Sequence, residues 1–274
     1  MRGLLVAFGA IYLVTLLLFR LFEHRLIFFP DYPGRLSGDW HPQGLPLEDV
    51  WLEAADGVKL HAWWLPGENA EFTFLAFHGN ASNVAARAEV YRFLQRLPAN
   101  VLALEYRGYG RSEGWPSEAG LYLDAQAAYD HLIQQRGIAP RRIISYGQSL
   151  GTAVAVDLAS KREVGGVVLE APFPSARAVA RRVYWFVPGV QYVVRSKFDT
   201  AGKLASIHAA TLVVHCAHDP VLPYSFGEDV YARAREPKSI WRVDSACREE
   251  ASLIAPVEYR EQLLRFLSGV KAQN

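Results

Sequence analysis

Residues 147–151 read Gly-Gln-Ser-Leu-Gly, a Gly-x-Ser-x-Gly pattern that lies between two different kinds of local sequence. A short β-type run at 141–146 precedes it, and a small, apolar, helical stretch at 152–160 follows it. A serine on so sharp a strand-to-helix turn has its hydroxyl exposed above the edge of a sheet. The glycines are required because a side chain in so tight a turn would clash. The motif therefore predicts covalent acyl-transfer chemistry at Ser149.

The rest of the chain alternates between strand and helix patterns. Two alternating runs flank Asp56-Gly57, a dipeptide that favours an antiparallel hairpin at a sheet edge. The later apolar runs are separated by helical stretches of about a dozen residues, as in βαβ units. The pattern predicts a mainly parallel sheet of about eight strands flanked by helices, with strands at 50–54, 58–64, 72–77, 101–105, 143–146, 166–169, 211–215 and 239–243. Helices are predicted at 84–97, 117–136, 152–160, 175–187 and 255–267.

A histidine-glycine turn follows the strand predicted at 72–77. In a parallel sheet, function gathers at the carboxyl ends of the strands, and His78, Gly79 and Asn80 lie at such an end. A turn there can present a backbone N–H toward the space above Ser149. We expect the N–H groups of Asn80 and Leu150 to form an oxyanion hole. The alternative is a glycine turn with a hydrogen-bonded histidine and no catalytic role.

A glycine-punctuated loop at 105–114 follows the next strand. We interpret this loop as a rigid wall of the site, with Tyr106 beside His78, Gly79 and Gln148. Its Gly-x-Gly is not followed by Gly-x-x-Gly, so a dinucleotide-binding fingerprint is poorly supported.

An acid follows the strand predicted at 211–215. Asp219 at this position would orient a catalytic histidine, and the chain order of serine before aspartate fits a Ser-Asp-His triad. The alternative is a simple turn formed by Asp219 and Pro220.

Together these motifs resemble the α/β-hydrolase superfamily, and within it the membrane-anchored Bem46-like group, which is related to depalmitoylating serine hydrolases. The resemblance spans nearly the whole chain and rests on segments 26–30, 78–80, 106–112, 147–151, 170–173 and 215–223. It implies an α/β-hydrolase fold with a short or absent lid, Ser149 as nucleophile and Asp219 as triad acid. It implies no cofactor and no metal.

The resemblance also implies a histidine after the last strand, but the loop at 244–252 contains none. Arg248 stands at the position where the family has its histidine. Arginine stays protonated and cannot accept the proton of Ser149. Other candidate bases are His218, His78, and Glu249 or Glu250; Arg248 is alternatively a substitution in an otherwise active sequence. It can also form a structural ion pair with Asp219.

The N-terminal stretch at 3–19 carries no charge. As a helix it would be about 26 Å long, close to the roughly 30 Å of a bilayer's hydrocarbon core. A cleaved signal peptide is less well supported, because residues 19–23 make a poor cleavage site. We expect a single-pass anchor at 1–24, a connector rich in Pro, Gly and aromatics at 25–46, and a hydrolase domain at 47–274; a buried helix is the alternative. The orientation stays open, because basic residues flank both ends.

The composition narrows the partners. A net charge of +1 without a basic stripe argues against a nucleic-acid partner. Cys216 and Cys247 fit no zinc pattern, although one bridge between them is possible. The apolar residues 184–188 either pack against the sheet or form a hydrophobic lip for an acyl chain.

The sequence thus predicts a membrane-associated serine hydrolase that cleaves ester or thioester bonds of a small-molecule or lipid acyl substrate. A catalytically impaired hydrolase fold with a binding or scaffold role is the alternative, because of Arg248. A peptidase-type amide hydrolase is a weaker one. The sequence leaves the oligomeric state open.

Overall fold

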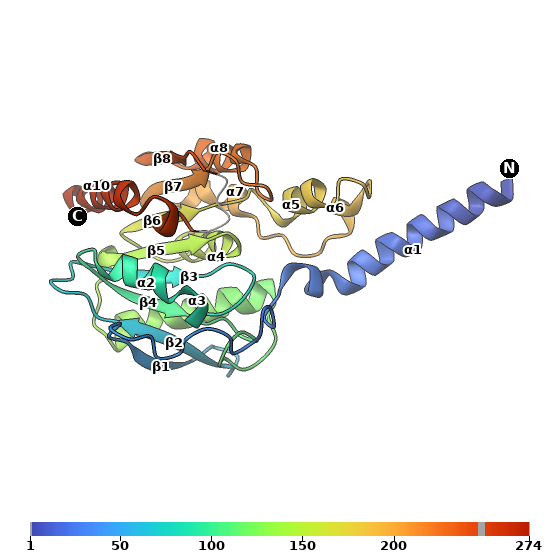
Figure 1. Ribbon diagram of the computed structural model, residues 1–274. Coiled ribbons are helices and arrows are strands. Elements are labelled where there is room, and N and C mark those ends of the chain that lie inside the picture. Colours follow the sequence, from blue (N-terminus) through green and yellow to red (C-terminus); the bar gives the residue numbers. More distant parts are fainter. Residues whose placement is uncertain (1, 246–249, 274) are drawn as a thin grey trace.

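An eight-stranded sheet with helices on both faces forms the body of the protein, and one long helix projects from it (Figure 1). The computed structural model describes residues 2–245 and 250–273. Helix α1 (Arg2–Ile27) is the projecting helix, and it is long and apolar enough to cross a membrane, with a mean hydropathy of 2.3.

The sheet has the order β1-β2-β4-β3-β5-β6-β7-β8. Strand β2 pairs antiparallel with β1 and β4, and all other neighbours are parallel. The α/β-hydrolase fold and the edge hairpin predicted from sequence are therefore confirmed. The strands are β1 (Glu48–Glu53), β2 (Lys59–Leu65), β3 (Phe72–Phe77), β4 (Ala99–Leu104), β5 (Ile143–Gln148), β6 (Gly166–Glu170), β7 (Ala210–Cys216) and β8 (Lys238–Val243).

Each face of the sheet packs against its own set of helices. Leu75 and Phe77 of β3 belong to the core that includes α3 (Glu118–Gln134), α4 (Leu150–Ala159) and α8 (Tyr224–Arg233). Phe72 and Phe74 of the same strand face α2 (Ala88–Gln95) and α10 (Pro256–Gln273). Because side chains alternate along a strand, one run of apolar residues supplies both cores.

Helix ends follow local sequence signals. The Ser117 hydroxyl accepts the Gly120 N–H at 3.0 Å and begins α3 where it was predicted. The helix predicted at 84–97 opens as a 3-10 turn (Ala85–Arg87) before α2. The last helix extends beyond its predicted end at residue 267 to Gln273.

The helix predicted at 175–187 is shorter than predicted. Helix α5 (Ala176–Val183) ends five residues before Pro188, and a separate short helix, α6 (Val190–Val193), begins beyond the predicted range. Proline has no N–H to donate to a carbonyl one turn back and clashes with it. Gly189, at φ +80°, then turns the chain into α6. We call residues 176–193 the cap.

The outer part of the cap packs against α1, whereas Ala176 and Val179 at its start pack against the main core on the sheet. The Tyr12 hydroxyl donates to the Pro188 carbonyl, and the rings of Phe19 and Tyr184 meet edge to face at 4.8 Å. Ala180, Val187 and Val190 form a small apolar cluster with residues of α1. Two short helices, α7 (Thr200–Lys203) and α9 (Ala251–Ile254), complete the α-helices of the described chain, and single 3-10 turns lie at Pro140–Arg142 and Leu204–Ser206.

Candidate active site

Ser149 lies on a sharp turn between β5 and α4. Its backbone has φ +49° and ψ −116°, a conformation that residues other than glycine rarely adopt. The Ser149 N–H donates to the Glu170 carbonyl at 2.9 Å, and the Thr152 N–H donates to the Ser149 carbonyl at 2.9 Å. The serine side chain makes no capping bond to α4, so its hydroxyl is available to a substrate.

The two glycines of the motif permit this turn. A Cβ on Gly151 would lie 2.0 Å from the Phe77 carbonyl oxygen, and one on Gly147 would lie 2.3 Å from the Gly151 carbonyl oxygen. Real Cβ atoms do not approach backbone this closely, so β3, β5 and α4 meet at this spacing only without side chains. This is the clash that the sequence predicted.

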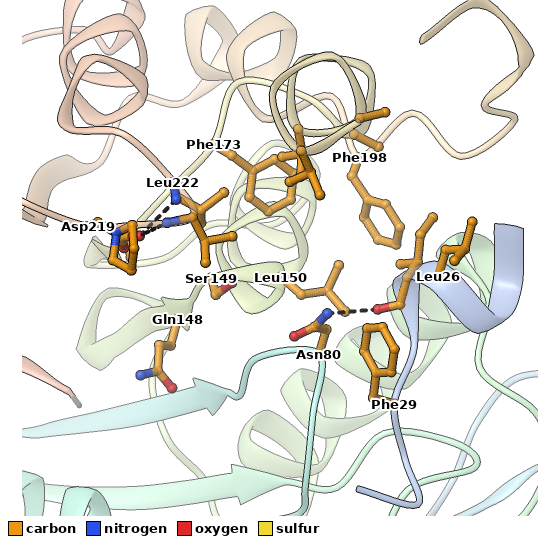
Figure 2. A pocket seen from close by; sticks show the side chains of 18 of the residues that line it. Leu26, Phe29, Asn80, Gln148, Ser149, Leu150, Phe173, Phe198, Asp219 and Leu222 are labelled. Atoms are coloured by element: carbon orange, nitrogen blue, oxygen red, sulfur yellow. Dashed lines mark hydrogen bonds between the residues drawn. The ribbon is translucent and has the colours of Figure 1, made fainter. Parts of the chain in front are cut away.

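The turn after β3 lies against the serine. A Cβ on Gly79 would lie 3.6 Å from the Cβ of Ser149, which places the two backbones in near contact. The Asn80 side chain donates to the Ile27 carbonyl at 2.9 Å, and the Asn80 carbonyl accepts the Phe29 N–H at 2.9 Å. The end of α1 is therefore bonded to this turn (Figure 2). The Leu150 N–H begins α4, so no helical carbonyl lies one turn back to accept it.

The loop at 105–114 supports this turn from behind and does not line the cavity beside Ser149. The hydroxyls of Tyr106 and Tyr109 donate to the carbonyls of His78 and Asn80 at 2.9 and 2.8 Å. The carboxylate of Glu105 accepts the Val84 N–H at 3.1 Å. The expected wall at Tyr106 is thus a buried brace, because its ring points into the core under the turn.

His78 is fully enclosed in the same brace. Its Nδ1 lies 2.7 Å from the Gly79 carbonyl, and its Nε2 lies 3.1 Å from Glu105 Oε1. Burial lowers the pKa of His78, although Glu105 favours the charged form. With both ring nitrogens engaged, His78 is not arranged to take a proton from Ser149. It is also absent from the cavity wall, whereas Gln148 and Asn80 belong to it.

Asp219 lies on the loop after β7, on the wall of the same cavity as Ser149. Its Oδ1 accepts the N–H groups of Val221 and Leu222, both at 2.8 Å. Figure 2 shows these two bonds and places Asp219 on the side of the cavity opposite Phe29. The two bonds fix the carboxylate. Because both go to Oδ1, the other oxygen, Oδ2, remains for another partner.

The cavity beside Ser149 has a volume of about 650 Å³ and is mainly apolar. This size is typical of pockets for small organic ligands, which are about 300–1,000 Å³. Its wall combines the sheet edge with α1, the cap and the loop after β7: Phe19, Glu23, Leu26, Ile27, Phe29, Phe173, Ala176, Val179, Ala180, Val183, Tyr184, Val190, Val194, Phe198, Val214, Pro220, Val221 and Leu222.

Glu170 connects the serine turn to the loop after β8. Its Oε2 accepts the hydroxyls of Tyr146 and Tyr259 at 2.5 and 3.3 Å, and its Oε1 accepts the Ala251 N–H at 2.7 Å. Burial raises the pKa of Glu170, although these three donors favour its charged form. Segment 170–173 carries part of the family resemblance, but the sequence analysis gave the side chain of Glu170 no role.

The other candidate bases from the sequence analysis are His218 and Glu249 or Glu250. Arg248 and Glu249 lie outside the described residues, as does Cys247. His218 is exposed, and its Nε2 lies 3.5 Å from an Asp244 carboxylate oxygen. Glu250 lines the cavity.

His215 is the one histidine on the cavity wall within the described chain, and the sequence analysis assigned it no role. Its Nε2 donates to the Leu222 carbonyl at 2.8 Å. Its Nδ1 faces α8, where a Cβ on Gly227 would lie 2.6 Å away. Neither nitrogen is directed at Ser149. Across the described ranges, no three His, Cys, Asp or Glu side chains gather as metal ligands would.

Comparisons with known proteins agree with this architecture. A family model described as serine aminopeptidase, S33, matches residues 68–200. The α/β hydrolase domain-containing protein WAV2 of Arabidopsis thaliana is 37% identical over 253 residues, which is 85% of this chain and 82% of that protein. The uncharacterized protein YfhR of Escherichia coli is 30% identical, over 91% of this chain and 89% of that protein.

Solved structures share the fold at low sequence identity. An esterase of Pyrococcus furiosus, Pf2001, superposes with a TM-score of 0.72 at 21% identity, covering 88% of this chain and 97% of that one. An α/β hydrolase from Vibrio vulnificus superposes with a TM-score of 0.71 at 24% identity, covering 85% and 88%.

Proposed function

This protein belongs to the α/β-hydrolase superfamily, and from that premise we propose that it is a serine hydrolase of carboxylic esters or thioesters with an apolar acyl group. The observation that carries the proposal is the position of Ser149. It lies at a strained turn, at the N-terminus of α4, on the wall of an apolar cavity of about 650 Å³. A nucleophile needs this exposure, and an acyl chain needs this kind of wall.

In the proposed reaction, the Ser149 Oγ attacks the carbonyl carbon of the bound ester. The N–H groups of Asn80 and Leu150 would stabilise the negative oxygen of the tetrahedral intermediate. The bond to the alcohol or thiol then breaks, that group leaves with a proton, and an acyl-enzyme remains. Attack by water releases the acid and restores Ser149.

The proton of Ser149 needs an acceptor when the hydroxyl attacks the ester. In the family pattern, Asp219 would orient a histidine at position 248, where this chain has arginine. Glu250 lines the cavity and belongs to the same loop, which makes it the candidate substitute among the described residues. The proposed roles are therefore Ser149 as nucleophile, Asp219 as orienting acid and Glu250 as acceptor.

One set of variants tests the proposal. The native chain, Ser149→Ala, Glu250→Gln and Arg248→His are compared in hydrolysis of short-chain p-nitrophenyl esters and in labelling by a fluorophosphonate. Ser268→Ala is the matched control, because Ser268 is exposed on α10. We expect labelling and turnover to depend on Ser149 and to be unaffected in Ser268→Ala.

The Arg248→His variant tests whether position 248 is the place of the missing base. A gain of several orders of magnitude in Arg248→His identifies position 248 as the base position, because losing a triad histidine costs about 10⁶ in kcat in subtilisin. If neither the native chain nor Arg248→His is labelled at Ser149, the serine-hydrolase proposal is wrong.

A binding role is the second candidate function, and a specific observation favours it. Within the described chain, His78 and His215 have their ring nitrogens engaged or facing away from Ser149, and His218 is exposed. An intact apolar cavity without a base would still hold an acyl chain. Tight binding of a fatty acid to a chain that neither labels nor turns over would support this role.

An amide substrate is a weaker alternative. The family model that matches residues 68–200 is described as serine aminopeptidase. Cleavage of aminoacyl anilides faster than of esters would favour it over the ester proposal.

We also propose that α1 anchors the protein in a membrane as a single span. Its support is the apolar length of Gly3–Ile27, whose side chains are largely exposed in the isolated chain. Flotation of the full chain with lipid vesicles after alkaline washing is the test.

A further inference from the structure

The cap lies beside α1 along the apolar part of that helix. The contacts run from Tyr12, bonded to Pro188, through Leu16, to Phe19, packed on Tyr184. At 1.5 Å per residue, this contact covers about 10 Å of α1. All of it falls inside the uncharged stretch 3–19.

This position sets a geometric condition on any membrane-spanning α1. If the cap stayed outside the bilayer, only residues 3–11, about 14 Å of helix, would remain to cross a hydrocarbon core of about 30 Å. If the whole uncharged stretch lies in hydrocarbon, the part of the cap that touches Tyr12 lies about 10 Å below the level of Phe19. That depth stays within one leaflet.

The free surface of the cap has the composition of a membrane-contacting surface. Trp185, Phe186 and Tyr192 are 75%, 63% and 76% exposed. Tryptophan and tyrosine are enriched where a protein meets the membrane interface. Arg181 and Arg182 are exposed on α5, and arginines at such a boundary reach outward to lipid phosphates. Figure 1 shows α5 and α6 on the same side of the body as α1.

We propose that the cap is immersed in the membrane leaflet beside α1, with Trp185, Phe186 and Tyr192 in contact with lipid. The inference rests on the proposed anchoring by α1. It commits this surface to one partner, the lipid bilayer, and it follows from the continuity of the cap with an apolar helix that would already lie there.

The cavity connects this surface to the serine. Phe19 and Leu26 of α1 and Ala180, Val183 and Tyr184 of the cap line the same cavity as Ser149. With the cap in the leaflet, the part of the cavity wall that α1 and the cap form would lie next to the lipid acyl chains. The substrate class that fits is a membrane-embedded lipid ester or a membrane-bound S-acyl group.

Tryptophan fluorescence tests the immersion directly. The chain has seven tryptophans, and α1 contains none, so quenching by lipid comes from the body or the cap. The full chain is reconstituted in phosphatidylcholine–phosphatidylglycerol vesicles whose acyl chains carry bromine, a short-range quencher. Trp185→Phe is compared with Trp51→Phe, whose tryptophan is 57% exposed on the edge strand β1.

We expect bromolipid to quench the native chain, Trp185→Phe to lose most of the quenched emission, and Trp51→Phe to keep it. If the protein floats with the vesicles but quenching is the same in Trp185→Phe, the immersion is wrong and the anchoring stands. If the protein does not float, the anchoring itself is wrong. The protein could also form a dimer in detergent that Trp185→Phe dissociates, while bromolipid quenches that variant as much as the native chain. This result would assign the surface to a second copy of the chain and overturn the inference.

Discussion

The backbone at Ser149 is held in a conformation that costs free energy, of the order of 1–3 kcal/mol for such a residue. The surrounding contacts hold it there: a bond to the Glu170 carbonyl on one side and two bonds from Thr152 on the other. The strain keeps the hydroxyl clear of the helix it precedes. At the residue scale, the exposed position of the Ser149 hydroxyl therefore depends on backbone packing at Gly147 and Gly151 that leaves no room for a single extra carbon.

A substitution at Gly151 can measure how much this tight backbone packing contributes to stability. In Gly151→Ala the new Cβ would lie 2.0 Å from the Phe77 carbonyl oxygen, so the turn at Ser149 must open. We expect a loss of about 3 kcal/mol, or a fall in Tm of roughly 6–12 °C, read by thermal unfolding in mild detergent. Gly269→Ala is the control, because a Cβ there meets nothing within 4 Å on α10, and alanine should stabilise that helix by about 0.5–1 kcal/mol. Equal effects at both positions would contradict the packing argument.

Because His215 is buried, we expect the free energy of unfolding to fall in acid. Burial lowers the pKa of His215 below its ordinary 6.5, although the Leu222 carbonyl and Asp219 favour the charged form. The unfolded chain therefore binds this proton more readily than the folded one. The neutral imidazole of His215 therefore contributes to the free energy of unfolding above pH 6.5. This contribution is lost as the pH falls from 6.5 through the lowered pKa of the folded state.

We expect His215→Gln, which can keep a donor toward Leu222, to lose less Tm than the native chain between pH 7.5 and pH 5. His41→Gln is the control, since His41 is exposed, and it should leave the pH slope unchanged. An identical slope in native and His215→Gln would show that other groups dominate the acid response.

At the scale of elements, carboxylates fix the cap and its return to the body. Glu23, buried at the end of α1, accepts the N–H groups of Arg195 and Ser196, both at 2.8 Å. Glu118 at the start of α3 accepts the N–H groups of Lys197 and Phe198 at 2.6 and 2.8 Å. Four successive backbone donors are thus satisfied by two side chains, one of them on the projecting helix.

Removing Glu23 should loosen the segment that follows the cap. In Glu23→Ala both backbone donors lose a charged acceptor, each bond being worth about 1.5–3 kcal/mol. We expect the amides of Arg195 and Ser196 to exchange with deuterium at least about tenfold faster, measured on the full chain in detergent. Glu258→Ala on exposed α10 is the control. Unchanged exchange at residues 195–196 would mean that other contacts hold this segment.

At the scale of the whole molecule, the cavity forms where four distant parts of the chain meet. The end of α1, the turn after β3, the cap and the loop after β7 each supply part of its wall. The bonds of Asn80 to Ile27 and Phe29 join the projecting helix to the proposed oxyanion turn. We therefore expect the choice of substrate to depend on how these four parts assemble and not on the motif around Ser149 alone.

Filling the cap side of the cavity tests that view. Ala180 is buried on the cavity wall, so Ala180→Phe shortens the space for an acyl chain. We expect kcat/KM for a decanoate ester to fall roughly 10–100-fold while an acetate ester changes little, in whichever of the native chain or Arg248→His turns over. Ala232→Phe, exposed on α8, should affect neither ester. Equal losses for both chain lengths would place the acyl path elsewhere.

The strands are the elements that the local sequence predicts most accurately. All eight were predicted within two residues of their ends, because each apolar run is bounded by turn residues and buried on one or both faces. For the helix predicted at 175–187, the local sequence does not predict the end correctly. Its apolar residues continue to Val187, but the helix ends at Val183, and Tyr184 and Val187 beyond that end pack against α1.

The sequence by itself determined the sheet, the turn at 147–151 and the apolar character of α1, since each depends on residues close together in the chain. Only the tertiary structure decided that α1 and the cap complete the cavity, that Tyr106 and His78 brace the turn from behind, and that Glu170 ties it to Ala251. These contacts join residues up to 176 positions apart. No local pattern encodes them, because they depend on how packed elements fill the space between them.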